Sequence, residues 1–257
     1  MQAWKTLEVT YDDAIVTVTF NRPEKLNAWN SELVDEMFKV ITDAQTKQNV
    51  RVVVLTGKGK AFSVGGDLNE FLASSAQQVE TFNRKVIELF RFIEKMRKPV
   101  IAAVNGYCNL ELIQAVDFVL ASKNAKFGLP EVNVAISPGA GILVRLPRLI
   151  NRLRAKEIAF FGEWVDAESA KAMGLVNVLV EPEKLLETAQ TYAKKLAEKP
   201  PLTLGAIKAV INNSWEMSLD EAMEYQLKEN SALFNTEDLR EGIKAFLEKR
   251  KPVFQGK

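Results

Sequence analysis

Histidine is absent from the 257 residues, and cysteine occurs once, as Cys108. The first absence excludes catalysis by a histidine base, including Ser-His-Asp and Cys-His arrangements, and it excludes most transition-metal sites. The second excludes an intrachain disulfide and a cysteine-rich zinc site. If the chain is an enzyme, then carboxylates, backbone amides, lysine, tyrosine or a cofactor must carry its chemistry.

A strong charge imbalance and long apolar runs are also lacking. The net charge of +1 gives no electrostatic reason to expect nucleic acid or an anionic membrane as the main partner. No apolar run approaches the ~20 residues that cross a bilayer, and the first residues contain no apolar segment typical of a secretion signal. With 47% hydrophobic and 26% charged residues, the composition is that of a globular protein, and we expect it in the cytoplasm.

The hydrophobic pattern predicts alternating strands and helices in the first half of the chain. Residues 14–20 alternate apolar and threonine side chains, as in a half-buried strand, whereas residues 51–56 and 99–104 are mostly apolar, as in strands buried on both faces. Helical spacing extends over residues 30–48, with Asn30 as the N-cap, and over residues 76–97. This alternation predicts an α/β fold with a largely parallel sheet.

From about residue 149 the pattern becomes mainly helical, interrupted by one predicted strand at residues 176–180. We therefore divide the chain into a core domain, residues 1–195, and a helical C-terminal region, residues 196–257. The helices predicted in this half cover residues 152–161, 167–172, 184–198, 202–213, 219–233 and 236–250.

Three segments resemble a known protein family. They are FNRPEKLNAWN at residues 20–30, GKGKAFSVGGDLNEF at residues 57–71 and AKFGLPEVNVAISPGAG at residues 125–141. Each is similar to a segment of the crotonase superfamily, the enoyl-CoA hydratase/isomerase group, and the resemblance continues into the tail at residues 234–257. Because the segments follow one another in the family's order, the resemblance is more specific than a single glycine loop.

The resemblance implies a fold, a substrate and an assembly. The fold would be the α/β crotonase (ClpP-like) fold, in which repeated β-β-α units form a spiral core with a helical C-terminal portion. The substrate would be an acyl-CoA thioester, and no metal or separate cofactor is expected because coenzyme A is part of the substrate. Family members are usually trimers or pairs of trimers, so we expect a homotrimer or hexamer in which the C-terminal helices form the contacts.

Two glutamates and one glycine are candidate catalytic residues. The resemblance implies that Glu111 and Glu131 flank one water molecule and that the backbone amide of Gly66 forms half of an oxyanion hole. Hydration needs such a pair because one carboxylate activates water while the other, protonated, delivers a proton to the enolate carbon. Two carboxylates at one buried site also push their pKa values apart. Taken singly, Glu111 is better explained as a carboxylate at a helix N-terminus, and Glu131 is better explained by a loop salt bridge.

Two segments are implied to contact coenzyme A. Lys25, Leu26 and Ala28 match the part of the family that contacts the nucleotide end, largely through backbone groups, although a surface turn after Pro23 is the better explanation for Lys25 alone. The second segment borders the thioester and consists of Val64, Gly65, Gly66, Asp67 and Leu68.

The glycine-rich turn that supplies the family's second oxyanion donor is three residues shorter here. Residues 105–111 read NGYCNLE, where the family reads NGYALGGGLE. The nearest substitutes are the amides of Cys108 and Asn109, and Asn109 is our candidate catalytic residue. Three explanations stay open: a hole rebuilt around Asn109 at the helix start, a relative with weak or altered activity, or residues missing from the sequence. Ala135 also replaces a family glycine, and residues 142–144 are more apolar than in the family.

The leading hypothesis is an enoyl-CoA hydratase-like enzyme that adds water to a 2-enoyl-CoA through an oxyanion-stabilised thioester enolate. The alternatives are an enoyl-CoA isomerase or acyl-CoA decarboxylase of the same fold, or a weakly active or non-catalytic acyl-CoA binder with a shortened oxyanion turn. An RNA-binding relative is a further hypothesis, against which the near-neutral charge argues despite the basic residues in 244–251.

Overall fold

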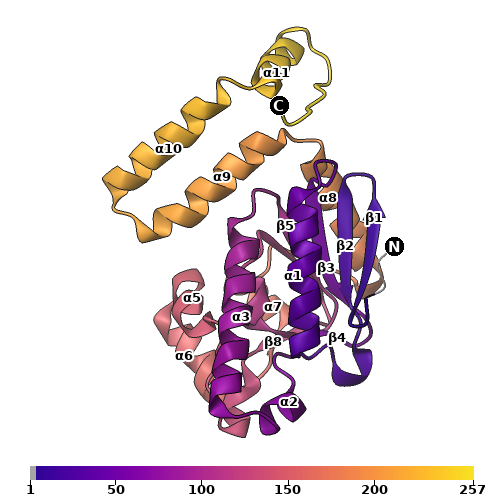
Figure 1. The fold of residues 1–257 in the computed structure, drawn as a ribbon, viewed down its shortest axis with the longest axis vertical. Coiled ribbons are helices and arrows are strands. Elements are labelled where there is room, and N and C mark those ends of the chain that lie inside the picture. The colour runs from indigo at the N-terminus through magenta and orange to yellow at the C-terminus, as the bar shows by residue number, and fades with distance from the viewer. Residues whose placement is uncertain (1–3) are drawn as a thin grey trace.

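A six-stranded sheet lies at the centre of the computed structural model, which describes residues 4–257 (Figure 1). Its strand order is β1-β2-β3-β5-β7-β10, and all neighbouring strands are parallel except the antiparallel pair β1 and β2. The three strands predicted at residues 14–20, 51–56 and 99–104 are confirmed as β2, β3 and β5, and β1 is an additional edge strand. The bounds are β1 (Leu7–Asp12), β2 (Ile15–Phe20), β3 (Val52–Gly57), β5 (Val100–Val104), β7 (Phe118–Ser122) and β10 (Val178–Val180).

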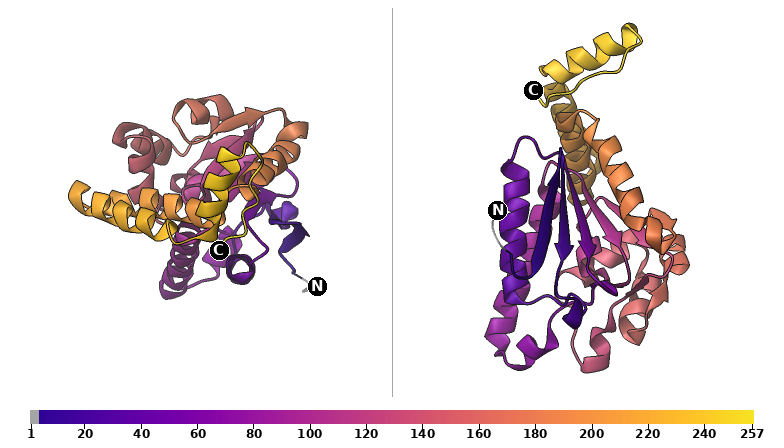
Figure 2. Two further views of the ribbon diagram at one scale, coloured as in Figure 1. Left: turned by 90° about the horizontal axis from the view of Figure 1, so that it is seen from above. Right: turned by 90° about the vertical axis from the view of Figure 1, so that its right-hand side faces the viewer.

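Both faces of this sheet are buried because its central strands alternate their apolar side chains between two helical layers. In β3, Val53 and Leu55 pack in the larger core with α1 (Ser31–Thr46) and α3 (Ala76–Lys95). Val52 and Val54 pack on the opposite face, in the smaller core beneath α8 (Leu185–Ala197). The right-hand view of Figure 2 shows these helices on the two sides of the strands. The Asn30 side chain caps α1, as predicted, by accepting from the amide of Leu33.

A second sheet holds the segments that form the candidate site. It has the order β4-β6-β8-β9, and its strands have only two or three residues each, which is too short to show a periodicity in sequence. In the chain, β3 is followed by β4, β5 by β6 and β7 by β8, and each pair leads into helical segments. This repetition is the predicted series of β-β-α units. The bounds are β4 (Ala61–Ser63), β6 (Tyr107–Asn109), β8 (Lys126–Gly128) and β9 (Val165–Asp166).

Short helical segments connect these units. A proline begins each of two 3-10 turns, η1 (Pro23–Lys25) and η2 (Pro130–Val134), of which η2 carries Glu131. The helix α5 was not predicted, because Pro147 interrupts its apolar pattern. The remaining bounds are α2 (Leu68–Leu72), α4 (Leu110–Ile113), α5 (Ile142–Leu149), α6 (Arg152–Phe161), α7 (Ala167–Ala172) and η3 (Pro182–Lys184).

The last helices extend away from the sheets (Figure 1). They are α9 (Pro201–Asn213), the 3-10 turn η4 (Ser214–Glu216), α10 (Leu219–Leu233) and α11 (Glu237–Leu247), which confirm the predicted helical C-terminal portion. Lys208 attaches α9 to the core, since its ammonium group lies 2.8 Å from Asp117 Oδ2. None of the helices within residues 4–257 combines the length and the apolar character needed to cross a membrane. The boundary at residue 196 stays a prediction.

Candidate active site

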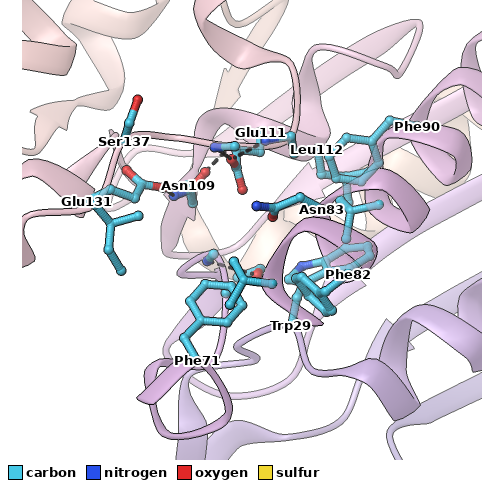
Figure 3. A pocket seen from close by; sticks show the side chains of 18 residues that line it. Trp29, Phe71, Phe82, Asn83, Phe90, Asn109, Glu111, Leu112, Glu131 and Ser137 are labelled. Carbon is cyan, nitrogen blue, oxygen red and sulfur yellow. Dashed lines mark hydrogen bonds between the residues drawn. The ribbon is translucent and has the colours of Figure 1, made fainter. Parts of the chain in front are cut away.

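A cavity of about 250 Å³ opens between α3, the loop after β4 and the segment that follows β8 (Figure 3). Aromatic and aliphatic side chains form most of its wall. Phe71 and Phe82 meet edge to face with their ring centroids 5.4 Å apart. Trp29 and Phe90 do the same at 5.6 Å. Glu111 and Glu131 are the only titratable side chains among the 18 lining residues. The cavity therefore suits an apolar group held beside two carboxyl groups.

The loop after β4 presents a free backbone N–H to this cavity. Trp29 N donates to Gly65 O at 2.7 Å, and Asp67 N donates to Trp29 O at 2.9 Å. Gly66 lies between these two bonds and lines the cavity, and its own N–H has no hydrogen-bond partner among residues 4–257. Gly65 has a φ of +94°, which favours glycine. The loop thus leaves the amide of Gly66 available to a ligand.

Glu111 is held at the cavity wall by two backbone amides. Its Oε1 accepts from Gly139 N at 3.1 Å and from Ala140 N at 3.0 Å. Burial and the neighbouring charge of Glu131 raise the pKa of Glu111 to about 7, although the two amides act in the opposite direction. Its amide partners belong to another segment, so the carboxylate does more than occupy the start of its own short helix.

Glu131 is partly buried and is bound by one side chain. Its Oε1 accepts from Asn109 Nδ2 at 2.5 Å, while its Oε2 is buried and has no partner among the described residues. Burial raises the pKa of Glu131 above its ordinary value. No lysine or arginine within residues 4–257 forms an ion pair with it. The loop salt bridge is therefore not what the structure shows for Glu131.

Asn109 connects the two glutamates through its side chain. It ends β6 and caps α4, where its Oδ1 accepts from Glu111 N at 3.0 Å. The sequence prediction concerned the backbone amide of Asn109, which stays a prediction, and it missed the carboxamide. The sequence did contain a signal for this side-chain role, because asparagine is among the preferred residues at the position directly before a helix.

The predicted coenzyme A residues are divided between the cavity and its surroundings. From the second segment, Gly65 and Gly66 line the cavity, whereas Val64, Asp67 and Leu68 do not. Lys25, Leu26 and Ala28 lie on the turn that precedes Trp29, and they also lie outside the cavity wall. Their contact with coenzyme A stays a prediction.

Two further features bear on the site. Ala135, which stands where the family has glycine, has a φ of +58°, in the left-handed region that favours glycine. Asn83, which sequence reasoning missed, projects from α3 into the cavity with its carboxamide directed towards Glu111 (Figure 3). Within residues 4–257, no three or more acidic, histidine or cysteine side chains gather closely enough to hold a metal ion.

Known proteins share both the sequence and the fold. The model of the enoyl-CoA hydratase/isomerase family matches residues 10–257. A short-chain-enoyl-CoA hydratase of Clostridium acetobutylicum is 37% identical, over 92% of this chain and 92% of its own length. A crotonyl-CoA hydratase of Syntrophomonas wolfei is 36% identical, over 99% of this chain and 100% of its own length.

Solved structures of enoyl-CoA hydratases have the same fold as this chain. An enoyl-CoA hydratase from Bacillus anthracis superposes with a TM-score of 0.95 at 35% identity, covering 98% of this chain and 100% of its own. Another from Geobacillus kaustophilus gives a TM-score of 0.93 at 37% identity, with 99% of both chains covered. The cavity with its two glutamates lies within a fold that these proteins share over their whole length. The chain belongs to the enoyl-CoA hydratase/isomerase family and has the crotonase fold.

Proposed function

We propose that the protein adds water to the double bond of a 2-enoyl-CoA by way of a thioester enolate. The observation that carries this proposal is the pair Glu111 and Glu131 beside the free N–H of Gly66, in one mostly apolar cavity. The names of the relatives agree with it, since they are hydratases of short-chain enoyl-CoA and crotonyl-CoA. The apolar wall would receive the acyl chain, and the carboxyl groups would face the carbons that react.

In this mechanism the Gly66 amide stabilises the charge that develops on the thioester oxygen. One such donor contributes roughly 2.7–4 kcal/mol in enzymes where it has been removed. One glutamate takes a proton from water as the oxygen adds to the β-carbon, and the other gives a proton to the α-carbon. The backbone amide of Asn109 is our candidate for the second donor. The reaction as proposed uses acid–base groups only.

Coenzyme A would enter beside the turn that carries Lys25, Leu26 and Ala28. This turn leads directly into Trp29, which lines the cavity and is bonded to Gly65. A nucleotide held along the turn would therefore place its thioester arm towards Gly66. Removal of the Lys25 charge should raise the KM for an enoyl-CoA without a matching change in kcat, if the ammonium contacts the nucleotide.

The test of the hydratase proposal is turnover of crotonyl-CoA by purified protein. Glu111→Gln and Glu131→Gln should each lower kcat at least about a hundredfold, which is the low end of what a positioned acid or base contributes. Glu163→Gln, at an exposed glutamate outside the cavity wall, is the matched control and should keep full activity. If either cavity variant keeps most of its activity, the assignment fails.

Related chemistries remain the second candidate, because the oxyanion turn is short. Isomerisation of a 3-enoyl-CoA or decarboxylation of a malonyl-type thioester also proceeds through an enolate, and isomerisation can run on one carboxylate. Assays with these thioesters beside crotonyl-CoA separate the reactions. A protein that binds CoA esters but turns over none of them would instead be a non-catalytic binder.

We also propose that the chain assembles into a homotrimer or hexamer through its C-terminal helices. These helices expose large apolar side chains: Ile211, Leu219, Met223, Leu227, Phe246 and Leu247 are between 53% and 83% exposed. Isolated apolar side chains are common on surfaces, but a series of them along neighbouring helices is typical of a contact region. Light scattering should give the mass of three or six chains, and a monomer would contradict the proposal.

A further inference from the structure

Asn83 interrupts the apolar face that α3 presents to the cavity. Val79, Val86 and Phe90 lie on the same face at helical spacing from Asn83, and all four side chains line the cavity. The Asn83 carboxamide projects into the cavity and is directed towards Glu111 (Figure 3). A polar group at one position of a mostly apolar wall is typical of a site that recognises a polar group on its ligand.

The protein itself does not use the hydrogen-bonding groups of this carboxamide. The Asn83 side chain has no hydrogen-bond partner among residues 4–257. A carboxamide has two N–H donors and one oxygen that accepts twice. An acyl chain that fills the cavity displaces the water that would bond to these groups. Binding then costs free energy unless the chain supplies a partner of its own.

Gly139 packs against the flat face of the carboxamide. A Cβ atom built on Gly139 would lie 2.8 Å from Asn83 Nδ2 and 3.0 Å from both Cγ and Oδ1. Since that position is nearly equidistant from the three atoms, it lies over the plane of the carboxamide and not at its edge. Hydrogen bonds of an amide lie near its plane, so Gly139 leaves the N–H and C=O groups of Asn83 free for a ligand.

The carboxamide lies near the reacting end of the cavity. Gly139, against which it packs, also binds Glu111, because Gly139 N donates to Glu111 Oε1 at 3.1 Å. If the thioester oxygen meets the N–H of Gly66 and the double bond lies beside the two glutamates, the next carbons of the acyl chain follow the wall near Asn83. We therefore expect the partner of Asn83 on C4 or C5 of the acyl group.

The charges of the cavity wall determine which polar group fits. Glu111 and Glu131 are the only titratable side chains among the 18 lining residues. A carboxylate on the acyl chain would meet no cation there and would be repelled by the glutamates, whereas an ammonium group would pair with them and withdraw them from the reaction. A hydroxyl group is neutral and can either donate to Asn83 Oδ1 or accept from Nδ2.

We propose that Asn83 is a specificity-determining residue that selects 2-enoyl-CoA substrates with a hydroxyl group on C4 or C5 of the acyl chain. The inference rests on the proposed hydration and names its substrate class. The hydroxyl group bonds the Asn83 carboxamide in place of water, whereas a plain hydrocarbon chain leaves the carboxamide unpaired. Asn83 takes no part in bond formation, so water adds to both kinds of chain in the same way.

The test compares pairs of thioesters that differ by one oxygen atom. They are 4-hydroxycrotonyl-CoA with crotonyl-CoA, and 5-hydroxy-2-pentenoyl-CoA with 2-pentenoyl-CoA. In at least one pair kcat/KM of the unaltered protein should be at least about tenfold higher for the hydroxylated ester, because the other ester leaves a polar group of the site unpaired. Asn83→Leu replaces the carboxamide with an apolar group of similar size and should abolish this preference.

The matched control is Gln77→Leu, at an exposed position of α3 outside the cavity wall, and it should keep the preference. If Asn83→Leu lowers kcat/KM by the same factor for both esters of a pair, Asn83 serves the reaction itself and the proposal is wrong. The absence of a preference in both pairs for the unaltered protein would also overturn it.

Binding of saturated esters separates this proposal from the proposed hydration and needs no folded variant. Butanoyl-CoA and pentanoyl-CoA, with their 4-hydroxy and 5-hydroxy counterparts, have no double bond to hydrate, and calorimetry gives their Kd values. We expect Kd to be at least about tenfold lower for the hydroxylated ester of the preferred pair. Equal values in both pairs would contradict the proposal even where crotonyl-CoA is hydrated. If crotonyl-CoA is not hydrated, a lower Kd still supports recognition of the hydroxyl group, so the two failures are distinct.

Discussion

Arg22 joins the two segments that border the cavity, because its Nη2 lies 2.9 Å from Asp67 Oδ2 while its Nη1 donates to Ala28 O at 2.5 Å. Asp67 directly follows Gly66, and its Oδ1 caps α2 by accepting from Asn69 N at 3.0 Å. Burial alone would raise the pKa of Asp67, but the hydrogen bonds from Arg22 and Asn69 lower it below its ordinary value. Asp67, which the family resemblance placed among the coenzyme A contacts, is thus engaged within the protein.

Removal of the arginine should therefore leave a buried carboxylate without its partner. The exposed fractions of the Arg22 and Asp67 side chains are 15% and 8%. We expect Arg22→Met to lower the free energy of unfolding by about 3 kcal/mol, the lower end of the cost of breaking a buried pair. Urea unfolding at pH 7 measures it. Asp67→Asn added to Arg22→Met removes the stranded charge and should recover part of the loss; a double variant no more stable than the single one would contradict the explanation.

Gly65 should not tolerate a side chain. Its φ of +94° is unfavourable for any other residue, and a new Cβ would lie 2.7 Å from Asn109 Nδ2. We expect Gly65→Ala to cost about 1–3 kcal/mol of stability and to lower kcat more than it changes KM, since it displaces the group bound to Glu131. Thermal unfolding and crotonyl-CoA kinetics measure the two effects. Gly174→Ala is the control, because its φ is +87° but no atom lies within 4 Å of the new Cβ.

The comparison of the two glycine variants separates the effect of backbone strain from the effect of the contact between the new Cβ at Gly65 and the Asn109 carboxamide. Gly174→Ala should lose stability and keep its activity. If Gly65→Ala behaves in the same way, the packing of Asn109 against the loop has no functional consequence.

Lys208 should be needed for the docking of α9. Its Nζ lies 2.8 Å from Asp117 Oδ2 and donates to Ile93 O and Lys98 O at 3.1 Å. Burial lowers the pKa of Lys208 and raises that of Asp117, with their mutual attraction acting against both shifts. We expect Lys208→Met to destabilise the protein by about 3–5 kcal/mol, because the largely buried Asp117 carboxylate then lacks its charged partner. Denaturant unfolding of Lys208→Met, with and without Asp117→Asn, measures the cost and should show partial recovery in the double variant.

How much of the fold could be predicted depended on the length of each element. The apolar runs at residues 51–56 and 99–104 and the helical spacing over residues 30–48 and 76–97 predicted β3, β5, α1 and α3 to within a few residues, because long periodic segments carry their own signal. The strands of the second sheet carry no such periodic signal in their sequence. Strands as short as Ala61–Ser63 and Tyr107–Asn109 are defined only by their neighbours, and these are distant in sequence.

The residues of the candidate site also divide into those that could be predicted from the sequence and those that could not. The resemblance indicated Glu111, Glu131 and Gly66, and the structure brings all three to one cavity. It could not indicate the Asn109 carboxamide, because the turn is shorter than the family's and the partner of that side chain lies on a different strand–turn unit. Helical spacing along α3 predicted one apolar face but not that Asn83 on this face would border the cavity. Contacts between segments that lie far apart in the chain could not be predicted from the sequence.

The raised pKa of Glu111 has a consequence for stability that can be measured without substrate. The ordinary glutamate value is 4.5, and the folded-state value is about 7. Between these two pH values the folded protein holds a proton that the unfolded chain releases, so the stability falls as the pH rises through this window. The full loss would be up to about 3 kcal/mol, because each pKa unit corresponds to about 1.4 kcal/mol.

Glu111→Gln cannot lose a proton there, so it should become increasingly more stable than the unaltered protein as the pH rises from 5 to 8. A gain of up to about 3 kcal/mol corresponds to roughly 6–12 °C in Tm for a chain of this size. Glu241→Gln is a control of opposite sign, because hydrogen bonds from Arg250 and from the amide of Val253 lower the pKa of Glu241 to about 2. That variant should be less stable than the unaltered protein at pH 5 and at pH 8 alike. If the difference in Tm between Glu111→Gln and the unaltered protein is the same at both pH values, Glu111 does not hold its proton near neutrality.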